Sequence, residues 1–200
     1  MRSTPEWRQS GRTTEEGRFE GRRNIIVRAA RQCYEYKGVA KTSIADITRA
    51  VSITRELFYY YFSNKDLVTA SVMTTYMLDA RKALSQEVGS LPAEEELESA
   101  LHAMLRALRS WLATSSESPH PMVDVLRETG YSSVVVSYVA QEAVLALQEI
   151  GVLPGKAAPE ASESLSKGYQ LLIGGVIGEL AGEKPCEDAE IVAALVALLR

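Results

Sequence analysis

The chain has 200 residues, 46% of them hydrophobic and 24% charged, with a net charge of −4 at pH 7. This is the composition of a globular protein, long enough for one domain with a core or for two small ones. It contains neither the run of about 18–20 apolar residues that a membrane-spanning helix needs nor an N-terminal apolar region typical of a secretory signal, so we expect a cytoplasmic protein with no membrane partner.

Residues 1–19 are polar and predict a flexible arm. Its positive charges are Arg2, Arg8, Arg12 and Arg18. From about residue 21 to residue 36 the pattern becomes helical, because Ile25, Ala29 and Cys33 follow the i, i+4, i+8 spacing of one helix face.

Two short helices follow in the sequence. The stretch KTSIADITRA predicts the first, because Thr42 or Ser43 can cap its start and Ser43 with Asp46 resembles a capping box. Thr54 is a further N-cap and predicts a helix over residues 55–62. Two short helices joined by a turn of about four residues have the layout of a helix-turn-helix.

The second of these helices contains the aromatic run FYYYF. At 100° per residue, Phe58, Tyr61 and Phe62 lie within about 100° of one another and form an inner, core-facing stripe. Tyr59 and Tyr60 point outward, where a small domain gains nothing from two adjacent tyrosines. A surface that lies against DNA does gain, because each hydroxyl can donate a hydrogen bond to a phosphate oxygen.

The charge distribution agrees with a nucleic-acid partner. Residues 1–65 hold 13 Lys and Arg against 7 Asp and Glu, a net +6, whereas residues 66–200 hold 9 against 19, a net −10. A basic segment joined to an acidic one predicts that the basic segment meets a polyanion. The alternative is a chance imbalance between two solvated surfaces.

The stretch TSIADITRAVSITRELFYYYFSNKDL resembles the helix-turn-helix of the tetracycline-repressor (TetR) family of bacterial transcriptional regulators. The resemblance covers about residues 21–67 and includes the threonine before the second helix, IADI, the F-Y-x-Y-F run and S-N-K-D-L. It implies an all-α protein with an N-terminal three-helix head that contains the helix-turn-helix and a larger C-terminal helical part that binds a ligand and dimerises.

The resemblance also implies roles on DNA. Thr42 would cap the second helix and hold a phosphate, and the first turn of the third helix would enter the major groove, where Arg55 can bond guanine in a bidentate pair. Tyr59, Tyr60 and Lys65 would clamp phosphates. The implied DNA-binding set is Thr42, Ser43, Thr54, Arg55, Glu56, Leu57, Tyr59, Tyr60 and Lys65.

Two positions depart from the family pattern. Ser52 stands in the turn where glycine is common and where the chain usually passes through a positive φ, which costs a non-glycine residue free energy. Glu56 also stands where glycine is frequent. Its carboxylate either accepts a hydrogen bond from a cytosine amino group or suits the positive N-terminus of the helix, and the sequence leaves both open.

The remainder of the chain predicts six longer helices, over residues 65–88, 94–115, 121–129, 131–150, 159–182 and 187–199. Family members hold a small-molecule pocket in this region, and methionine and aromatic side chains suit an apolar or aromatic effector. The expected ligand-binding residues are Met73, Tyr76, Met77, Met104, Leu108, Trp111, Met122, Leu126, Tyr131 and Tyr138. The alternative for each is an ordinary core position.

The last two predicted helices are candidates for dimerisation. Gly174, Gly178 and Gly182 recur every four residues although each interior glycine costs about 1 kcal/mol of helix stability relative to alanine, so we expect another backbone to approach closely. The resemblance implies a homodimer through a four-helix bundle, and the alternative is a helix contact within one chain. The expected interface is Tyr169, Leu171, Gly174, Gly175, Gly178, Gly182, Val192, Leu195 and Leu199.

Catalysis has little support in the sequence, and we expect neither an enzyme nor a cofactor or metal. The two histidines, His102 and His120, occur without a Ser–His–acid spacing, a phosphate loop or a metal-ligand cluster. Cys33 and Cys186 are expected to be reduced thiols, with a redox sensor at Cys186 as the alternative.

The expected organisation is a flexible basic arm (1–19), a helix-turn-helix DNA-binding domain (20–65) and a C-terminal ligand-binding and dimerisation domain (66–200). The expected function is that of a repressor released from double-stranded palindromic operator DNA by a small apolar or aromatic effector. Two alternatives are a DNA-binding adaptor or architectural protein controlled by a protein partner, and an enzyme or ligand carrier with a vestigial helix-turn-helix.

Overall fold

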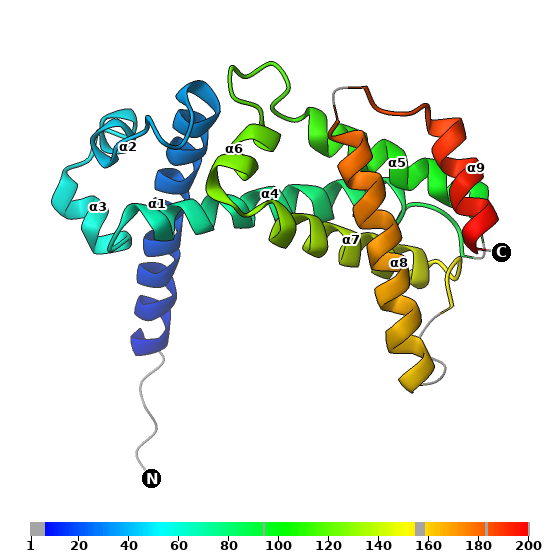
Figure 1. Cartoon of the computed structure of the whole chain (residues 1–200). Coiled ribbons are helices and arrows are strands. Elements are labelled where there is room, and N and C mark those ends of the chain that lie inside the picture. Colours follow the sequence, from blue (N-terminus) through cyan, green and yellow to red (C-terminus); the bar gives the residue numbers. More distant parts are fainter. Residues whose placement is uncertain (1–6, 94, 155–158, 183, 200) are drawn as a thin grey trace, which may run out of the picture. The chain divides into compact units, whose positions relative to one another are not determined.

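The structure, a computed structural model, describes residues 7–93, 95–154, 159–182 and 184–199, with the side chains of all of these except 7–16 and 159–164. The described residues form α-helices joined by turns and loops, without a strand among them, which confirms the predicted all-α class. In chain order the helices are α1 (Trp7–Lys37), α2 (Ile44–Ala50), α3 (Arg55–Tyr61), α4 (Lys65–Glu87), α5 (Leu97–Ala113), α6 (Met122–Thr129), α7 (Ser132–Glu149), α8 (Pro159–Leu180) and α9 (Asp188–Leu199) (Figure 1).

The start of the first helix differs most from the sequence prediction. A flexible arm is predicted over residues 1–19, whereas α1 begins at Trp7, so the prediction is wrong over residues 7–19. Residues 1–6 lie outside the described residues. Phe19 supplies a tertiary reason for the longer helix, because its ring centroid lies 4.7 Å from that of Tyr61 and 5.7 Å from that of Tyr60.

The chain divides into two compact units, and the boundary falls after Val72, inside α4. The sequence predicted it at residue 65. The first two turns of α4 belong to unit 1 because they complete its core: Val68 and Val72 are fully buried, and the hydroxyls of Tyr34 and Thr69 share a hydrogen bond of 2.8 Å. The rest of α4 continues into unit 2 as the same helix.

Unit 1 carries α2 and α3 beside α1 (Figure 1). Burial of apolar side chains is the main favourable term in holding such short helices, since isolated helices of seven residues are not stable in water. The predicted inward orientation of Phe58 and Phe62 is confirmed, as both are buried. The largest buried side chains of this core are Ile26, Tyr34, Ile47, Phe58 and Phe62.

Unit 2 is organised around α5, which buries one continuous face of alanine, leucine and methionine side chains and ends with buried Trp111. The Trp111 indole N–H donates to the Tyr76 carbonyl at 2.9 Å and ties α5 to α4. Helices α7 and α8 pack side by side, and α9 packs against α5 (Figure 1). Arg109 of α5 holds the start of α9 through Asp188, at 2.6 Å. None of the helices in the described part of the chain combines the length and the apolar character that a membrane span needs.

Candidate nucleic-acid interface

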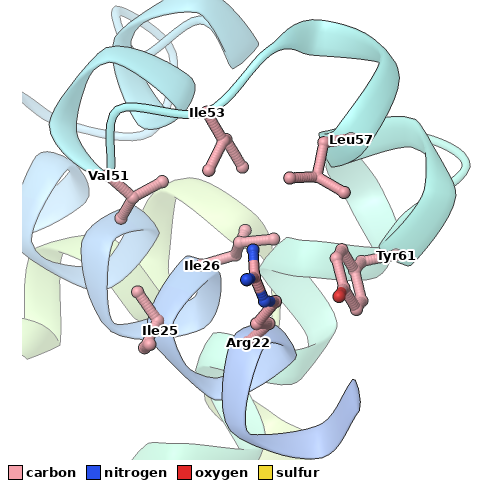
Figure 2. A pocket seen from close by; sticks show the side chains of 7 residues that line it. All are labelled: Arg22, Ile25, Ile26, Val51, Ile53, Leu57 and Tyr61. Atoms are coloured by element: carbon pink, nitrogen blue, oxygen red, sulfur yellow. The ribbon is translucent and has the colours of Figure 1, made fainter. Parts of the chain in front are cut away.

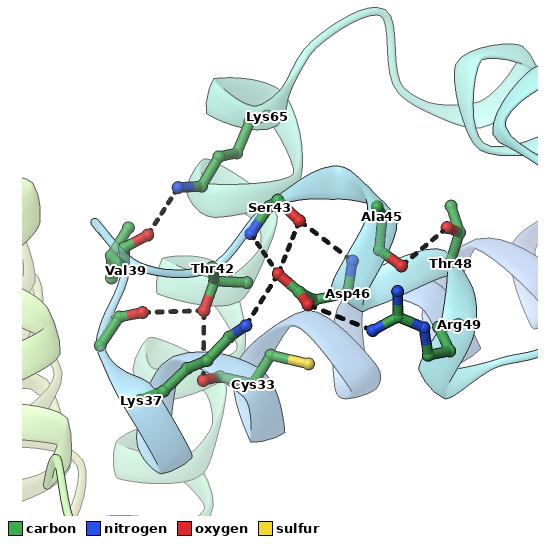
Figure 3. Close-up of polar contacts among 11 residues, drawn as sticks. Cys33, Lys37, Val39, Thr42, Ser43, Ala45, Asp46, Thr48, Arg49 and Lys65 are labelled. Carbon is green, nitrogen blue, oxygen red and sulfur yellow. Dashed lines mark hydrogen bonds and ion pairs between the residues drawn. The ribbon is translucent and has the colours of Figure 1, made fainter.

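Helix α2 begins at the capping box that the sequence predicts. The Ser43 backbone N–H donates to the Asp46 carboxylate at 2.8 Å, and the Asp46 N–H donates to the Ser43 hydroxyl oxygen at 3.2 Å. Lys37 at the end of α1 adds an ion pair to the same carboxylate at 2.7 Å (Figure 3). The hydrogen bonds from Lys37 and then Ser43 hold the pKa of the Asp46 carboxyl well below its usual range. The charged carboxylate therefore joins α1 to the start of α2 at neutral pH.

The turn between α2 and α3 passes through the left-handed region at Ser52, with φ 54°. This confirms the predicted conformation, which costs a residue with a side chain roughly 1–2 kcal/mol. Two backbone hydrogen bonds hold the turn: Ser52 N–H donates to the Arg49 carbonyl at 3.2 Å, and Ile53 N–H donates to the Thr48 carbonyl at 3.0 Å. The direction in which α3 leaves the turn is thereby determined.

Helix α3 begins at Thr54, as predicted, and the Thr54 hydroxyl oxygen accepts from the Leu57 N–H at 3.2 Å. The pKa of the Glu56 carboxyl is lowered, first by its own backbone N–H and then by the Thr54 hydroxyl. These contacts support the helix-terminus role for Glu56 over the cytosine contact. The adjacent Arg55 side chain is exposed and makes no hydrogen bond or ion pair with other described residues.

Tyr59 and Tyr60 project from the exposed face of α3, with 51% and 69% of their surface accessible, which confirms the predicted outward orientation. Both rings pack edge to face against another aromatic ring: the ring centroids of Tyr59 and Phe58 lie 5.7 Å apart, and those of Tyr60 and Phe19 lie the same distance apart. Arg55, Tyr59 and Tyr60 are therefore all exposed on α3, and the two tyrosine rings pack against buried Phe58 and half-buried Phe19.

Two other residues of α3, Leu57 and Tyr61, line a cavity. Tyr61, predicted in the core, is only half-buried, and it lines a cavity of about 260 Å³ between α3, the turn and α1 together with half-buried Leu57, whose DNA contact stays a prediction (Figure 2). The other lining residues are Arg22, Ile25, Ile26, Val51 and Ile53. Periodicity alone gave no signal for this cavity, because it depends on how well side chains from three segments fill the space between them.

Thr42 is placed differently from its predicted role as a phosphate ligand. Only 2% of its surface is exposed, and its hydroxyl donates to the Gly38 carbonyl at 2.8 Å, with a longer contact of 3.2 Å to the Cys33 carbonyl (Figure 3). The prediction is wrong because the Gly38 carbonyl, just beyond the end of α1, takes the hydroxyl hydrogen. Ser43, which is exposed, is the residue that caps α2.

Lys65 is half-buried, and its ammonium group donates to the Val39 carbonyl at 2.5 Å (Figure 3). An ammonium group has three N–H donors, so this bond leaves capacity for another acceptor. The predicted phosphate contact of Lys65 stays a prediction, with an added structural role in fixing the loop after α1.

Seven of the ten predicted ligand-binding residues are core residues of unit 2. The buried ones are Met73, Tyr76, Met104, Leu108, Trp111, Met122 and Leu126, while Met77, Tyr131 and Tyr138 are half-buried. The structure does bring several of them together: Trp111 bonds to Tyr76, and the Met73 sulfur accepts a contact of 3.8 Å from the hydroxyl of Thr129 in α6. Their role in ligand binding stays a prediction.

The predicted dimer residues divide into an exposed group and a buried group. Leu171 is 79% exposed, Gly175 and Gly178 are exposed, and a methyl group added at either glycine would meet no atom within 4 Å. Gly182 is also exposed, although its added methyl would lie 3.1 Å from the Glu179 carbonyl. One face of α8 is therefore open to a partner.

The buried group belongs to contacts within the chain. Val192 and Leu195 are buried, so their prediction as interface residues is wrong: they cover the core of unit 2. Gly174 faces α7, where a methyl group would lie 3.7 Å from Val136. Tyr169 and Leu199 are half-buried around a small gap that Leu195 also lines.

Unit 1 thus has the local structure of a helix-turn-helix protein, the class that the comparisons specify further. The profile of the family described as bacterial regulatory proteins, tetR family, matches residues 26–70. The HTH-type transcriptional regulator EthR of Mycolicibacterium smegmatis is 29% identical over 93 residues, and this match spans 46% of this chain but only 41% of that relative.

Two solved structures share the fold of the chain. RolR in complex with resorcinol superposes with a TM-score of 0.61 at 19% identity, over 92% of this chain and 90% of that one. A TetR-family transcriptional regulator from Pectobacterium atrosepticum gives a TM-score of 0.59 at 22% identity, over 92% and 95% of the two chains. In sequence over its N-terminal part, and in fold over most of its length, the chain is similar to the tetR family of bacterial regulatory proteins.

Proposed function

We propose that this protein is a transcriptional regulator that reads double-stranded DNA through α3. The observation that carries this proposal is the exposed surface of Arg55, Tyr59 and Tyr60, on a helix whose opposite face is anchored by buried Phe58 and Phe62. Arg55 supplies a planar fork for base edges, and the two tyrosines supply hydroxyls for phosphates. These are the two kinds of contact that a recognition helix makes in the major groove.

The test begins with DNA selected by the protein from a randomised pool. Arg55→Ala should weaken binding to the selected sequence by about 1–3 kcal/mol and leave binding to random DNA nearly unchanged. Tyr59→Phe should weaken both by the same factor. Arg127→Ala, which removes an exposed arginine of α6 that pairs with Asp124 at 2.6 Å, is the matched control. Equal losses for Arg55→Ala on both DNAs would refute base reading.

The exposed face of α8 supports a homodimer. Leu171 offers an apolar side chain, and Gly175 and Gly178 leave room for another backbone to approach. A second copy of the chain, docked about a two-fold axis, covers this face with the same face. Two DNA-reading units then predict a palindromic operator whose half-sites are about one helical turn apart or a multiple of it.

A small apolar or aromatic effector in unit 2 is the proposed signal for release of DNA. Met73, Tyr76 and Trp111 are buried in unit 2, where Trp111 donates to the Tyr76 carbonyl, and methionine side chains adapt to a bound ligand. The structure of RolR contains resorcinol, a small aromatic molecule, on the same fold. Helix α4 carries Lys65 at its start and Met73 about two turns later, so an effector that displaces Met73 acts on a helix shared with unit 1.

The effector test uses Trp111 as the reporter, in a Trp7→Phe protein that lacks the second tryptophan. Apolar and aromatic compounds, resorcinol among them, are titrated with and without the selected DNA. An inducer should bind more weakly to the DNA complex, by the same factor by which it weakens DNA binding. Equal affinities would favour the adaptor or architectural protein that answers to a protein partner.

A further inference from the structure

The cavity in unit 1 lies outside the exposed surface that the proposed function assigns to DNA. Its walls come from three segments: α1, the turn between α2 and α3, and α3 itself. Figure 2 shows the side chains of Ile25, Ile26, Val51, Ile53 and Leu57 converging on one space. Five aliphatic side chains surround about 260 Å³ and make an apolar recess that is open to solvent at Ile25, which is 46% exposed.

Arg22 is the charged member of the seven lining residues. Figure 2 shows its guanidinium directed into the space between Ile26 and Leu57, with the Tyr61 ring beside it. Among the described residues it has no hydrogen bond and no ion pair. The adjacent Arg23, in contrast, donates to the Ser71 hydroxyl at 2.8 Å and lies over the Phe62 ring at 4.9 Å. Arg22 is an exposed residue at the edge of the cavity, and no carboxylate among the described residues pairs with it.

Size and chemistry define the occupant. A volume of about 260 Å³ equals that of about nine liquid water molecules at roughly 30 Å³ each, which suits a compound on the order of ten non-hydrogen atoms. The aliphatic walls favour an apolar or aromatic body, and a guanidinium fork matches a carboxylate through two parallel hydrogen bonds. We propose that this cavity binds a small carboxylic acid with an apolar or aromatic body.

Occupancy of the cavity acts on α3, and this consequence rests on the proposed function. Leu57 and Tyr61 form one wall, and they belong to the same seven-residue helix as Arg55, Tyr59 and Tyr60. A compound bound between α1 and these two residues contacts α3 on the side that faces α1 and shifts the position of α3 relative to α1. Binding in the cavity and binding of DNA are then thermodynamically coupled. The coupling is positive if the shifted helix fits the DNA groove better and negative if it fits worse.

The test uses the full chain with labelled isoleucine, leucine and valine methyl groups and two probes of matched shape, 3-phenylpropionate and its neutral amide. The acid should shift the methyl resonances of Ile25, Ile26 and Ile53, with an affinity about tenfold above that of the amide, because hydrogen bonds to charged groups are the stronger ones. Arg22→Gln should remove this tenfold preference. Arg28→Gln, a change of an exposed arginine on the same helix that does not line the cavity, should preserve it.

Three outcomes would overturn the site: equal affinities for acid and amide, a preference that survives Arg22→Gln, or resonance shifts confined to unit 2. Repeating the titration on the complex with selected DNA tests the coupling, which predicts that the affinity for the acid changes by about fivefold or more. An unchanged affinity overturns the coupling alone. A protein that selects no DNA refutes the proposed function and leaves the acid site standing on the first titration.

Discussion

Replacing Thr42 with valine removes one hydroxyl from the junction between α1 and α2 and keeps the branched shape of the side chain. In the native chain that hydroxyl donates to the Gly38 carbonyl at 2.8 Å and lies 3.2 Å from the Cys33 carbonyl. A hydroxyl has one hydrogen, so the shorter contact is the main bond. Because Thr42 is 2% exposed, water has little access to replace it.

The magnitude follows from the carbonyl that loses its partner. A net hydrogen bond contributes about 1 kcal/mol, and a buried acceptor left without a partner costs about 1–3 kcal/mol, so Thr42→Val should lower the free energy of unfolding by about 1–3 kcal/mol. For a chain of this size each kcal/mol corresponds to roughly 2–4 °C in Tm. Thr42→Ser, which keeps the hydroxyl and loses one methyl group, should lose about 1 kcal/mol.

Two measurements on the same samples decide the matter: urea unfolding followed by circular dichroism, and affinity for selected DNA followed by fluorescence anisotropy. The structure predicts that Thr42→Val loses stability and, under conditions where it is fully folded, binds DNA as the native chain does. A valine variant of native stability with weakened DNA binding would show that the hydroxyl holds a phosphate, and would refute the structural reasoning.

Three further predictions concern assembly, pH and the core. Gly178→Leu should shift the chain from dimer to monomer in sedimentation, because the added side chain meets no atom of its own chain and can clash only with a partner. Gly21→Leu, at an equally open glycine of α1, should leave the dimer unchanged. A dimer unchanged by Gly178→Leu would exclude this face as the interface. Because the pKa of the Asp46 carboxyl is lowered, the native chain should be more stable than Asp46→Asn above about pH 4. That advantage should shrink progressively as the pH falls from about 4 toward the lowered pKa, so urea unfolding should show a smaller difference at pH 3 than at pH 7; a constant difference would contradict the ion pair. Tyr34→Phe and Thr69→Val should each cost about 1–3 kcal/mol and the pair less than the sum, because the 2.8 Å bond between them is buried; additive losses would disprove the coupling.

Features that depend on residues close together in the chain could be predicted from the sequence alone. The capping box of Ser43 and Asp46, the N-cap at Thr54 and the left-handed turn at Ser52 all depend on residues within about four positions of one another, so their pattern is legible in the sequence. The alternation of breakers and apolar periodicity likewise predicted the helices of unit 2 to within a few residues. The exposed tyrosines followed from the geometry of a single helix.

Tertiary structure decided which side chains remain free once the helices pack. Thr42 has the residue type of a phosphate ligand, but its hydroxyl donates to the Gly38 carbonyl. Val192 and Leu195 have the apolar pattern of an interface, but they are buried against the core of their own chain. Leu57 and Tyr61 face a cavity because side chains from α1 and the turn leave space that α3 does not fill. Each of these outcomes depends on volumes and hydrogen-bond partners brought together from separate segments, which a one-dimensional pattern does not contain.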